Sequence, residues 1–222
     1  MGIISEVSPI SDEIRKNIER AIKRQRAQAS PNEDTKLLDS IQNYLAVAQI
    51  PPVTIDLVLH EAALAIYRTF SFREITIGLK SEADGRYRYV EFFGISKTAE
   101  AALRELSYSL EEFFSQKDYP AIRLSKTTEL CIVEENPLLP MEKHTYNQST
   151  FLSRPRGSPE EFVEGDYMDI SMYNPEDELI GWLEVSKPMF NRMPSIQTIK
   201  RLELFAYVLS ILIQKTLLEE KC

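Results

Sequence analysis

The amino-acid sequence indicates an α+β protein, an α/β sandwich in which helices flank a central antiparallel sheet. Two pairs of alternating segments, within 74–93 and 167–185, each have the pattern of a β-hairpin. Helical patterns precede, separate and follow these pairs. Hairpins join antiparallel strands, and the strands do not alternate one by one with helices. This order therefore argues against a doubly wound parallel sheet.

The first 50 residues are predicted to form a helical N-terminal extension. Within 11–28, isoleucine recurs at every fourth position from Ile14 to Ile22, and six basic residues occupy much of the remaining surface. This basic run fits either a solvated face or a docking face for an acidic partner. Residues 33–48 carry a wider apolar side and are expected to form a second amphipathic helix.

The sequence Pro51-Pro52 is the predicted boundary before the main domain, 51–218. Proline removes a backbone donor and disfavours helix in the residue before it. A third helix is expected over 54–70. Its His60 is interpreted as a surface or packing residue, because no other residue stands at metal-ligand spacing nearby.

A β-hairpin follows, in which 74–79 and 86–93 alternate apolar and polar residues. Asp84-Gly85 supplies the turn, since both residues tolerate positive φ. The next segment, 97–116, repeats its apolar residues at helical spacing and is predicted to be one long helix. Its aromatic side chains are interpreted as core residues rather than as contacts to a cofactor.

The apolar runs 121–124 and 130–133 are predicted to be short strands. The segment 136–164 is rich in proline, polar and charged residues and is expected to be a long loop. Loops of this length often take part in binding.

The last part of the chain predicts a second hairpin and a closing helix. Residues 167–173 and 178–185 form the strands, and the polar turn between them contains Pro175. Ser195 is the expected N-cap of a helix that continues through Leu218.

Composition excludes several classes of protein. The 222 residues include 34 acidic and 26 basic side chains, a formal net charge of −8, which argues against a general nucleic-acid binder. Two cysteines, Cys131 and Cys222, are too few for a disulfide framework, so a reducing, cytoplasmic location is expected. No uncharged apolar run is long enough to suggest membrane insertion.

The sequence contains none of the catalytic motifs that carry specific chemistry. It lacks a glycine-rich phosphate loop, a C-x-x-C pair and an H-E-x-x-H motif, and it has two histidines in all. We therefore expect no enzymatic activity and can name no cofactor and no metal site. Cys131 is interpreted as a small buried apolar residue, with a reactive thiol as the alternative.

One stretch resembles a known family. Asp177–Val185 is similar to the second hairpin of GAF domains, and Arg192–Ala206 is similar to the start of their closing helix, as found in multi-domain microbial signalling proteins. The resemblance covers about 53–217. It implies a GAF-like fold and a sensory role. At Ser186-Lys187-Pro188 many relatives have Asp-Asp-Pro, so no carboxylate role is carried over there, and the ligand stays unnamed.

The leading hypothesis is a cytoplasmic signal-transduction module that binds a small ligand or partner between the sheet and 119–165. An output protein of signalling would act with it, either as a further part of the same chain or as a separate partner. Ligand pockets combine aromatic walls with a few polar groups. The candidate ligand-binding residues are Tyr119, Arg123, Cys131, His144, Tyr146 and Tyr167.

The terminal helices are expected to mediate homodimerisation. The closing helix has a seam from Ile199 to Ile213 at alternating spacings of three and four, and a neighbouring stripe of Phe205, Val208 and Leu212. We favour a second copy over that stripe; the alternative is cover by 11–28 and 33–48 of the same chain. Two other functions stay open: a ligand-free dimerisation scaffold with the same fold, and an enzyme that depends on Cys131.

Overall fold

A computed structural model describes residues 32–136, 139–142, 144–146, 150, 154 and 156–220. The predicted helix at 11–28, with its basic run, lies outside these residues. The chain divides into two units, Met1–Leu38 and Asp39–Cys222. Every contact described below lies within the second unit, and so does the boundary predicted at Pro51-Pro52.

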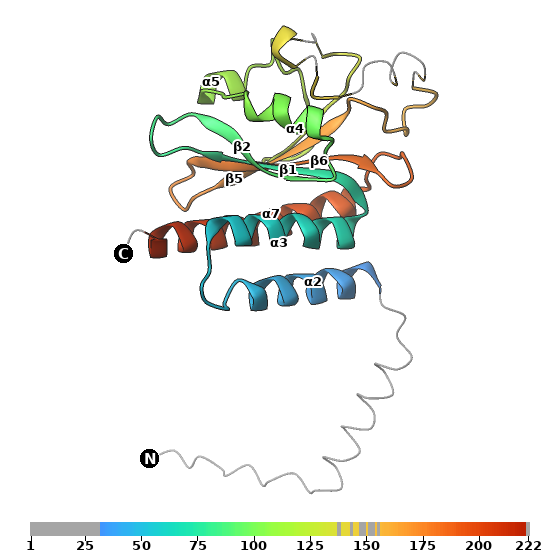
Figure 1. Cartoon of the computed structure of the whole chain (residues 1–222). Helices are drawn as coiled ribbons and strands as arrows, with labels where there is room; N and C mark the ends of the chain where they lie inside the picture. The colour runs from blue at the N-terminus through green and yellow to red at the C-terminus, as the bar shows by residue number, and fades with distance from the viewer. Residues whose placement is uncertain are drawn as a thin grey trace, which may run out of the picture. The chain divides into compact units, whose positions relative to one another are not determined.

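The second unit contains a six-stranded antiparallel sheet with the order β2-β1-β6-β5-β4-β3 (Figure 1). Both predicted hairpins are confirmed, as β1–β2 and β5–β6. They lie side by side because β1 of the first pairs with β6 of the second. The strands are β1 (Phe72–Lys80), β2 (Tyr87–Phe93), β3 (Ile122–Arg123), β4 (Thr128–Cys131), β5 (Tyr167–Tyr173) and β6 (Leu179–Pro188).

Helices lie on both faces of this sheet (Figure 1). On one face run α3 (Ile55–Phe70) and α7 (Ile196–Glu220), and on the other lie α4 (Lys97–Arg104) and α5 (Leu110–Phe113). Thr54 caps α3 through its side chain, and the predicted cap Ser195 accepts the amide of Thr198 at 3.1 Å. The α+β architecture predicted from the two hairpins is therefore confirmed.

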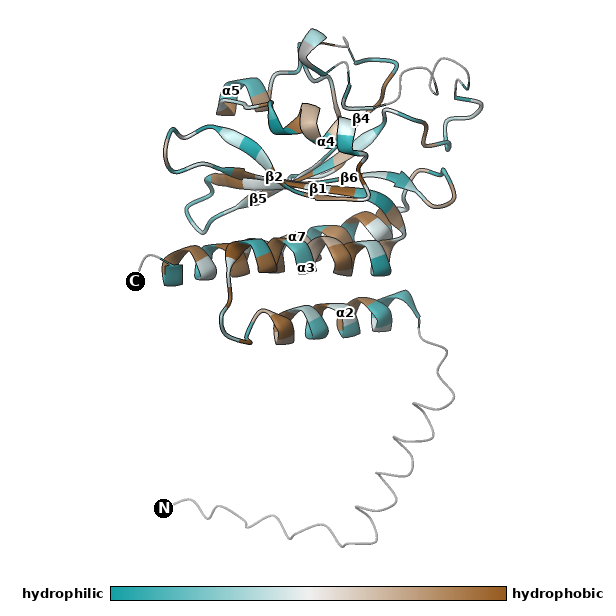
Figure 2. Ribbon diagram, in the orientation of Figure 1, coloured by the Kyte–Doolittle hydropathy of each residue, from teal (hydrophilic) through white to brown (hydrophobic). Residues whose placement is uncertain are grey.

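The main core fills the space between the sheet and the α3–α7 layer. Alternation along β5 turns Met168, Ile170 and Met172 toward these helices and leaves polar residues on the opposite face. Figure 2 shows the apolar residues of α3 and α7 gathered beneath the sheet. The largest fully buried members of this core are Phe72, Ile75, Ile77, Leu59, Ile66, Met168, Ile170, Met172, Leu183, Leu202 and Phe205.

Helix α2 (Glu33–Val47) covers part of α7, which corrects the prediction that a second copy covers the Phe205 stripe. The ring of Tyr44 stacks on Phe205 with centroids 5.3 Å apart, and its hydroxyl donates to the carbonyl of Val58 at 3.1 Å. Phe205 is fully buried, and Leu212 is 7% exposed. At Phe205 the structure therefore has the part of the alternative that concerns 33–48, and 11–28, its other part, lies outside the described residues.

The single helix predicted over 97–116 is wrong. α4 ends at Arg104, and α5 begins at Leu110. Between them, Tyr108 and Tyr87 exchange two backbone hydrogen bonds of 2.8 and 2.9 Å, which extends the chain locally. Ser109 then starts a new helix through a capping box, in which its side chain and that of Glu112 satisfy each other's backbone amides.

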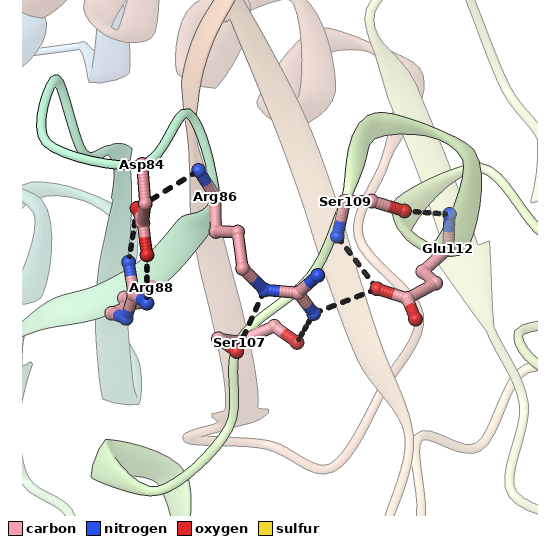
Figure 3. Close-up of polar contacts among 6 residues, drawn as sticks. All are labelled: Asp84, Arg86, Arg88, Ser107, Ser109 and Glu112. Atoms are coloured by element: carbon pink, nitrogen blue, oxygen red, sulfur yellow. Dashed lines mark hydrogen bonds and ion pairs between the residues drawn. The ribbon is translucent and has the colours of Figure 1, made fainter.

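Polar contacts tie this break to the first hairpin (Figure 3). Arg86, at the start of β2, donates to the Oγ and the carbonyl of Ser107 at 3.0 and 2.7 Å, and to Glu112 at 2.9 Å. In the same hairpin, Asp84 of the turn pairs with Arg88 of β2. The guanidinium of Arg86 therefore fixes the segment between α4 and α5 on the hairpin.

None of the helices in the described part of the chain is long and apolar enough to span a membrane.

Candidate ligand-binding cavity

A cavity opens on the sheet face opposite α3 and α7, beneath α4, α5 and the short helix η1 (Pro140–Glu142). Its empty volume is about 990 Å³ when the part open to solvent is included. Its floor is formed by side chains of β1, β2, β4, β5 and β6. The roof comes from α4, α5 and segments around 106–121, 142–146 and 164–166.

Aromatic rings form one wall of the cavity. The indole of Trp182 lies against the rings of Tyr89 and Phe113, with ring centroids 4.9 and 5.0 Å apart. It also lies directly over the backbone of β1, where a Cβ atom on Gly78 would meet the ring at 2.0 Å. Glycine at position 78 is therefore required for the indole to reach this position, because any side chain would displace it.

A row of three carboxylates crosses the cavity floor. In the strand register Glu129 of β4 pairs with Asp169 of β5, and Asp169 pairs with Glu184 of β6. All three side chains line the cavity. Directly paired residues have Cβ atoms about 5 Å apart, so like charges at these positions repel one another.

Burial and mutual repulsion both disfavour ionisation in this row. Burial raises the pKa of Glu184 to about 7, and burial together with the charge of Glu184 raises the pKa of Asp169 well above its usual value. The hydroxyl of Tyr89 donates to Glu184 Oε2 at 2.7 Å. Asp169 Oδ1 is buried and has no hydrogen-bond partner among the described residues.

A second acidic group enters from the roof. Glu142, in η1, is 8% exposed, and burial raises the pKa of its carboxyl. Tyr108 and Tyr119 line the same cavity, and their rings meet edge-on with centroids 5.6 Å apart. The roof therefore presents a carboxyl and two aromatic rings to the same cavity.

Ion pairs hold the segment that closes the rim. Lys187 bonds Glu74 at 2.7 Å and Glu164 at 3.2 Å. Asp166, whose side chain is fully buried, pairs with Arg156 at 2.8 Å and accepts the amide of Val133 at 3.0 Å. Each of these three carboxylates has a cationic partner, and the contacts of Asp166 anchor the chain before β5 to the end of β4.

Comparison with solved structures decides the fold. The GAF domain of a phosphoenolpyruvate-protein phosphotransferase from Coxiella burnetii aligns with 84% of this chain and 98% of its own, with a TM-score of 0.52 and 12% identity. The nlh2 GAF domain of A. aeolicus, in an inactive state, aligns over 82% and 98%, with a TM-score of 0.51 and 8% identity. This chain has the GAF fold.

A third solved structure is similar, whereas the sequence comparisons find no match. A methyl-accepting chemotaxis protein, residues 122 to 287, is similar over 81% of this chain and 99% of its own, with a TM-score of 0.50 and 14% identity. No family model matches the sequence. No curated protein matches it either. The GAF resemblance noted in the sequence is confirmed at the level of the fold.

In this GAF fold, four of the six candidate residues from the sequence come together. Tyr119, Cys131, Tyr146 and Tyr167 all line the cavity. Burial raises the pKa of the Cys131 thiol, which keeps the sulfur protonated and does not favour the reactive-thiol alternative.

The other two candidates lie away from the cavity lining. Arg123 is exposed at the end of the sheet, where its guanidinium donates to the carbonyls of Ser125 and Lys126 at 3.1 Å each. His144 is exposed. Arg123 was predicted as a polar group of a pocket between the sheet and 119–165, but β3 is the edge strand and the Arg123 side chain turns back onto the β3–β4 turn.

The sequence analysis did not predict the carboxylate row on the cavity floor. The signal was present, because Asp169 and Glu184 each interrupt a run of apolar residues in the middle of a strand. Carboxylates are rarely buried unless they are paired or functional. Among the described residues, no group of three or more histidine, cysteine or acidic side chains is placed to hold a metal ion.

Proposed function

We propose that the chain is a cytoplasmic sensory or regulatory module that binds a small ligand in this cavity, without catalysis. One observation carries the proposal: the cavity floor holds a buried carboxylate oxygen, Asp169 Oδ1, that no described group satisfies. An unsatisfied buried polar atom costs about 1–3 kcal/mol, and a ligand donor would remove that cost. Proteins named for phosphotransfer and chemotaxis share the fold, which supports a signalling role.

A direct link joins the cavity to the closing helix. Glu129 and Cys131 of β4 line the cavity, and Thr128, at the start of the same strand, donates to Glu203 of α7 at 2.7 Å. The hydroxyl of Ser125 also bonds this carboxylate. A ligand that moves β4 would therefore act on α7, provided that it contacts the two positions of β4 unequally.

The outer side of α7 is the proposed surface for a second copy of the chain. Leu204, Tyr207, Ile211 and Leu218 are 46%, 64%, 49% and 65% exposed, and they repeat at spacings of three, four and seven. Such spacing is that of a coiled-coil seam. This stripe takes the place of the one predicted from the sequence, and it would carry the signal to an output protein.

A ligand-free scaffold is the second candidate. A scaffold requires an interior filled by side chains, whereas the cavity has space above the unsatisfied carboxyl oxygen of Asp169. The dimer surface on α7 would serve a scaffold equally well. Ligand binding is therefore the property that separates the two functions.

Thermal unfolding with a broad panel of cellular metabolites tests the proposal. At a concentration one hundred times the dissociation constant, a ligand stabilises by about 2.7 kcal/mol, which corresponds to several degrees in this size range. We expect at least one compound to produce this shift, and Tyr119→Ala to reduce it. Arg123→Ala, outside the cavity, is the control and should leave the shift unchanged. A panel without any stabilising compound would favour the scaffold.

A further inference from the structure

The described part of the cavity lining is rich in acidic groups and poor in cations. Its described lining contains seven carboxylates and one cation, Lys187. That lysine is bound by Glu74 and Glu164 at the rim, and Asp166 is bound by Arg156. The carboxylates that remain are the row Glu129, Asp169 and Glu184 on the floor and Glu142 in the roof.

No cation of the described chain approaches this row to bond it. Arg123 is opposite Glu129 in the β3–β4 register, but its guanidinium bonds the carbonyls of the adjacent turn instead. Glu184 accepts a hydrogen bond from the Tyr89 hydroxyl, and Asp169 Oδ1 has no partner among the described residues. A positively charged donor is the complement that these oxygens lack.

The walls around the row favour the same kind of ligand. Trp182, Tyr89, Tyr108 and Tyr119 line the cavity, and each of these rings meets another edge-on. The faces of aromatic rings attract cations, and more strongly in places from which water is excluded. The same rings offer apolar surface to the rest of a ligand.

The acidic lining disfavours an anionic ligand strongly and a neutral ligand less strongly. A phosphate or carboxylate would meet four acidic side chains, and among cations the described lining offers it Lys187 at the rim alone. A bare metal ion is also disfavoured, since the described carboxylates are not grouped to coordinate one.

We infer that the ligand is a small organic cation, an amine or guanidine with an apolar body, held by Asp169 and Glu184 and enclosed by the aromatic wall. This inference rests on the proposed function. It adds the chemical class of the ligand, which the fold does not specify. The charged group would lie over the floor, where it can donate to Asp169 Oδ1, and the apolar body would lie against Trp182.

Charge-matched compounds test the inference. Binding of 2-phenylethylamine, 2-phenylethanol and 3-phenylpropionate to the full chain would be compared by titration calorimetry and thermal unfolding, with agmatine as a guanidine probe. We expect a cation to bind at least about tenfold more tightly than the neutral alcohol, and the acid not to bind. Equal binding of the alcohol or the acid would overturn the inference.

Asp169→Asn is the decisive variant. Asparagine has nearly the same shape as the protonated carboxyl that burial favours at this position, so the variant should fold. We expect it to lose the preference for cations, whereas Asp177→Asn, which removes an exposed carboxylate on the β5–β6 turn, should keep it. Glu184→Gln gives a second test of the same row. An unchanged preference in both floor variants would contradict the assignment.

The outcomes separate this inference from the proposed function. If compounds of the metabolite panel bind in the cavity but no cation does, the ligand class is wrong and the sensor remains. If neither the panel nor the cations bind, both fail. If cations bind and the floor variants abolish the preference, both are supported.

Discussion

Under the proposed function, Glu184 would serve ligand binding at the expense of stability. It lies in the middle of β6, between the buried side chains of Leu183 and Val185, where an apolar residue would pack well in most sheets. Instead it faces Asp169 across the strand pair and depends on the Tyr89 hydroxyl for its hydrogen bond. Residues that lower the stability of the fold are often found at functional sites, where function requires them.

This arrangement predicts a specific dependence of stability on pH. Glu184 has a pKa of about 7 in the folded chain, above its ordinary value near 4.5. Between these values the folded state keeps a proton that the unfolded state releases, so the free energy of unfolding falls as pH rises from about 4.5 to 7. Each unit of difference contributes about 1.4 kcal/mol.

Glu184→Gln should remove this contribution. The groups that face Glu184 from the surrounding elements are Thr76 and Glu74 on β1, Tyr89 on β2, Asp169 on β5, Glu129 on β4, Lys187 on β6 and Glu142 on η1. Denaturant unfolding at several pH values should give the variant a flatter decline between pH 5 and 7 than the parent chain. Glu176→Gln, on an exposed turn, is the control. Parallel curves for the parent and Glu184→Gln would contradict the assignment.

The elements themselves were largely predictable from local pattern. Both hairpins combine alternating residues with turn residues, which predicts the strands and their pairing, although each hairpin has one register shift, at Ile77/Gly78 and at Met172/Tyr173. The break between α4 and α5 was missed because the apolar spacing of 97–116 continues across it. A sequence signal was present, since Ser109 and Glu112 form the S-x-x-E pattern of a capping box. The contact that decides the break, Tyr108 on Tyr87, joins positions far apart in the chain.

The difference between local pattern and contacts of distant positions also explains which cavity residues the sequence did not reveal. Tyr167 was predicted as an aromatic wall of a pocket between the sheet and 119–165, and it lines the cavity from β5. The carboxylate row depends on the registers of β4, β5 and β6 together, and register between distant strands cannot be read from one segment. Arg123 was misplaced for a related reason, because nothing in its own strand shows that β3 is the edge.

The capping box gives a test at this level. Ser109→Ala removes the side chain that accepts the amide of Glu112 at 3.1 Å, and it should destabilise the chain by about 1 kcal/mol. Hydrogen exchange should accelerate at Glu112 and Phe113 and stay unchanged in β5. Ser109→Thr keeps the acceptor and is the control. Equal stability of the alanine and threonine variants would show that the break at 105–109 is held by other contacts.

Across the molecule, the GAF fold puts the cavity and the proposed dimer surface on opposite faces of one sheet. α7 buries one side against β5 and α3 and leaves a second apolar stripe outside. Thr128, which precedes the cavity-lining Glu129 on β4, hydrogen-bonds Glu203 of this helix, so β4 joins the cavity floor to α7. A movement of β4 at the cavity floor would therefore be transmitted to α7 and its outer stripe. In a dimer, the partner that contacts this stripe would respond to the movement.

The oligomeric state tests this arrangement. If the outer stripe of α7 is a seam, the chain should sediment as a dimer that dissociates on dilution. Ile211→Glu should make it monomeric, because the charge would be buried twice in a symmetric interface. Ile211 is half-exposed, so this variant should still fold. Phe190→Glu changes an 81% exposed apolar residue away from the stripe and should leave the dimer intact. A parent chain that stays monomeric at the highest attainable concentration would remove the seam from the proposal and leave the cavity as the surviving site.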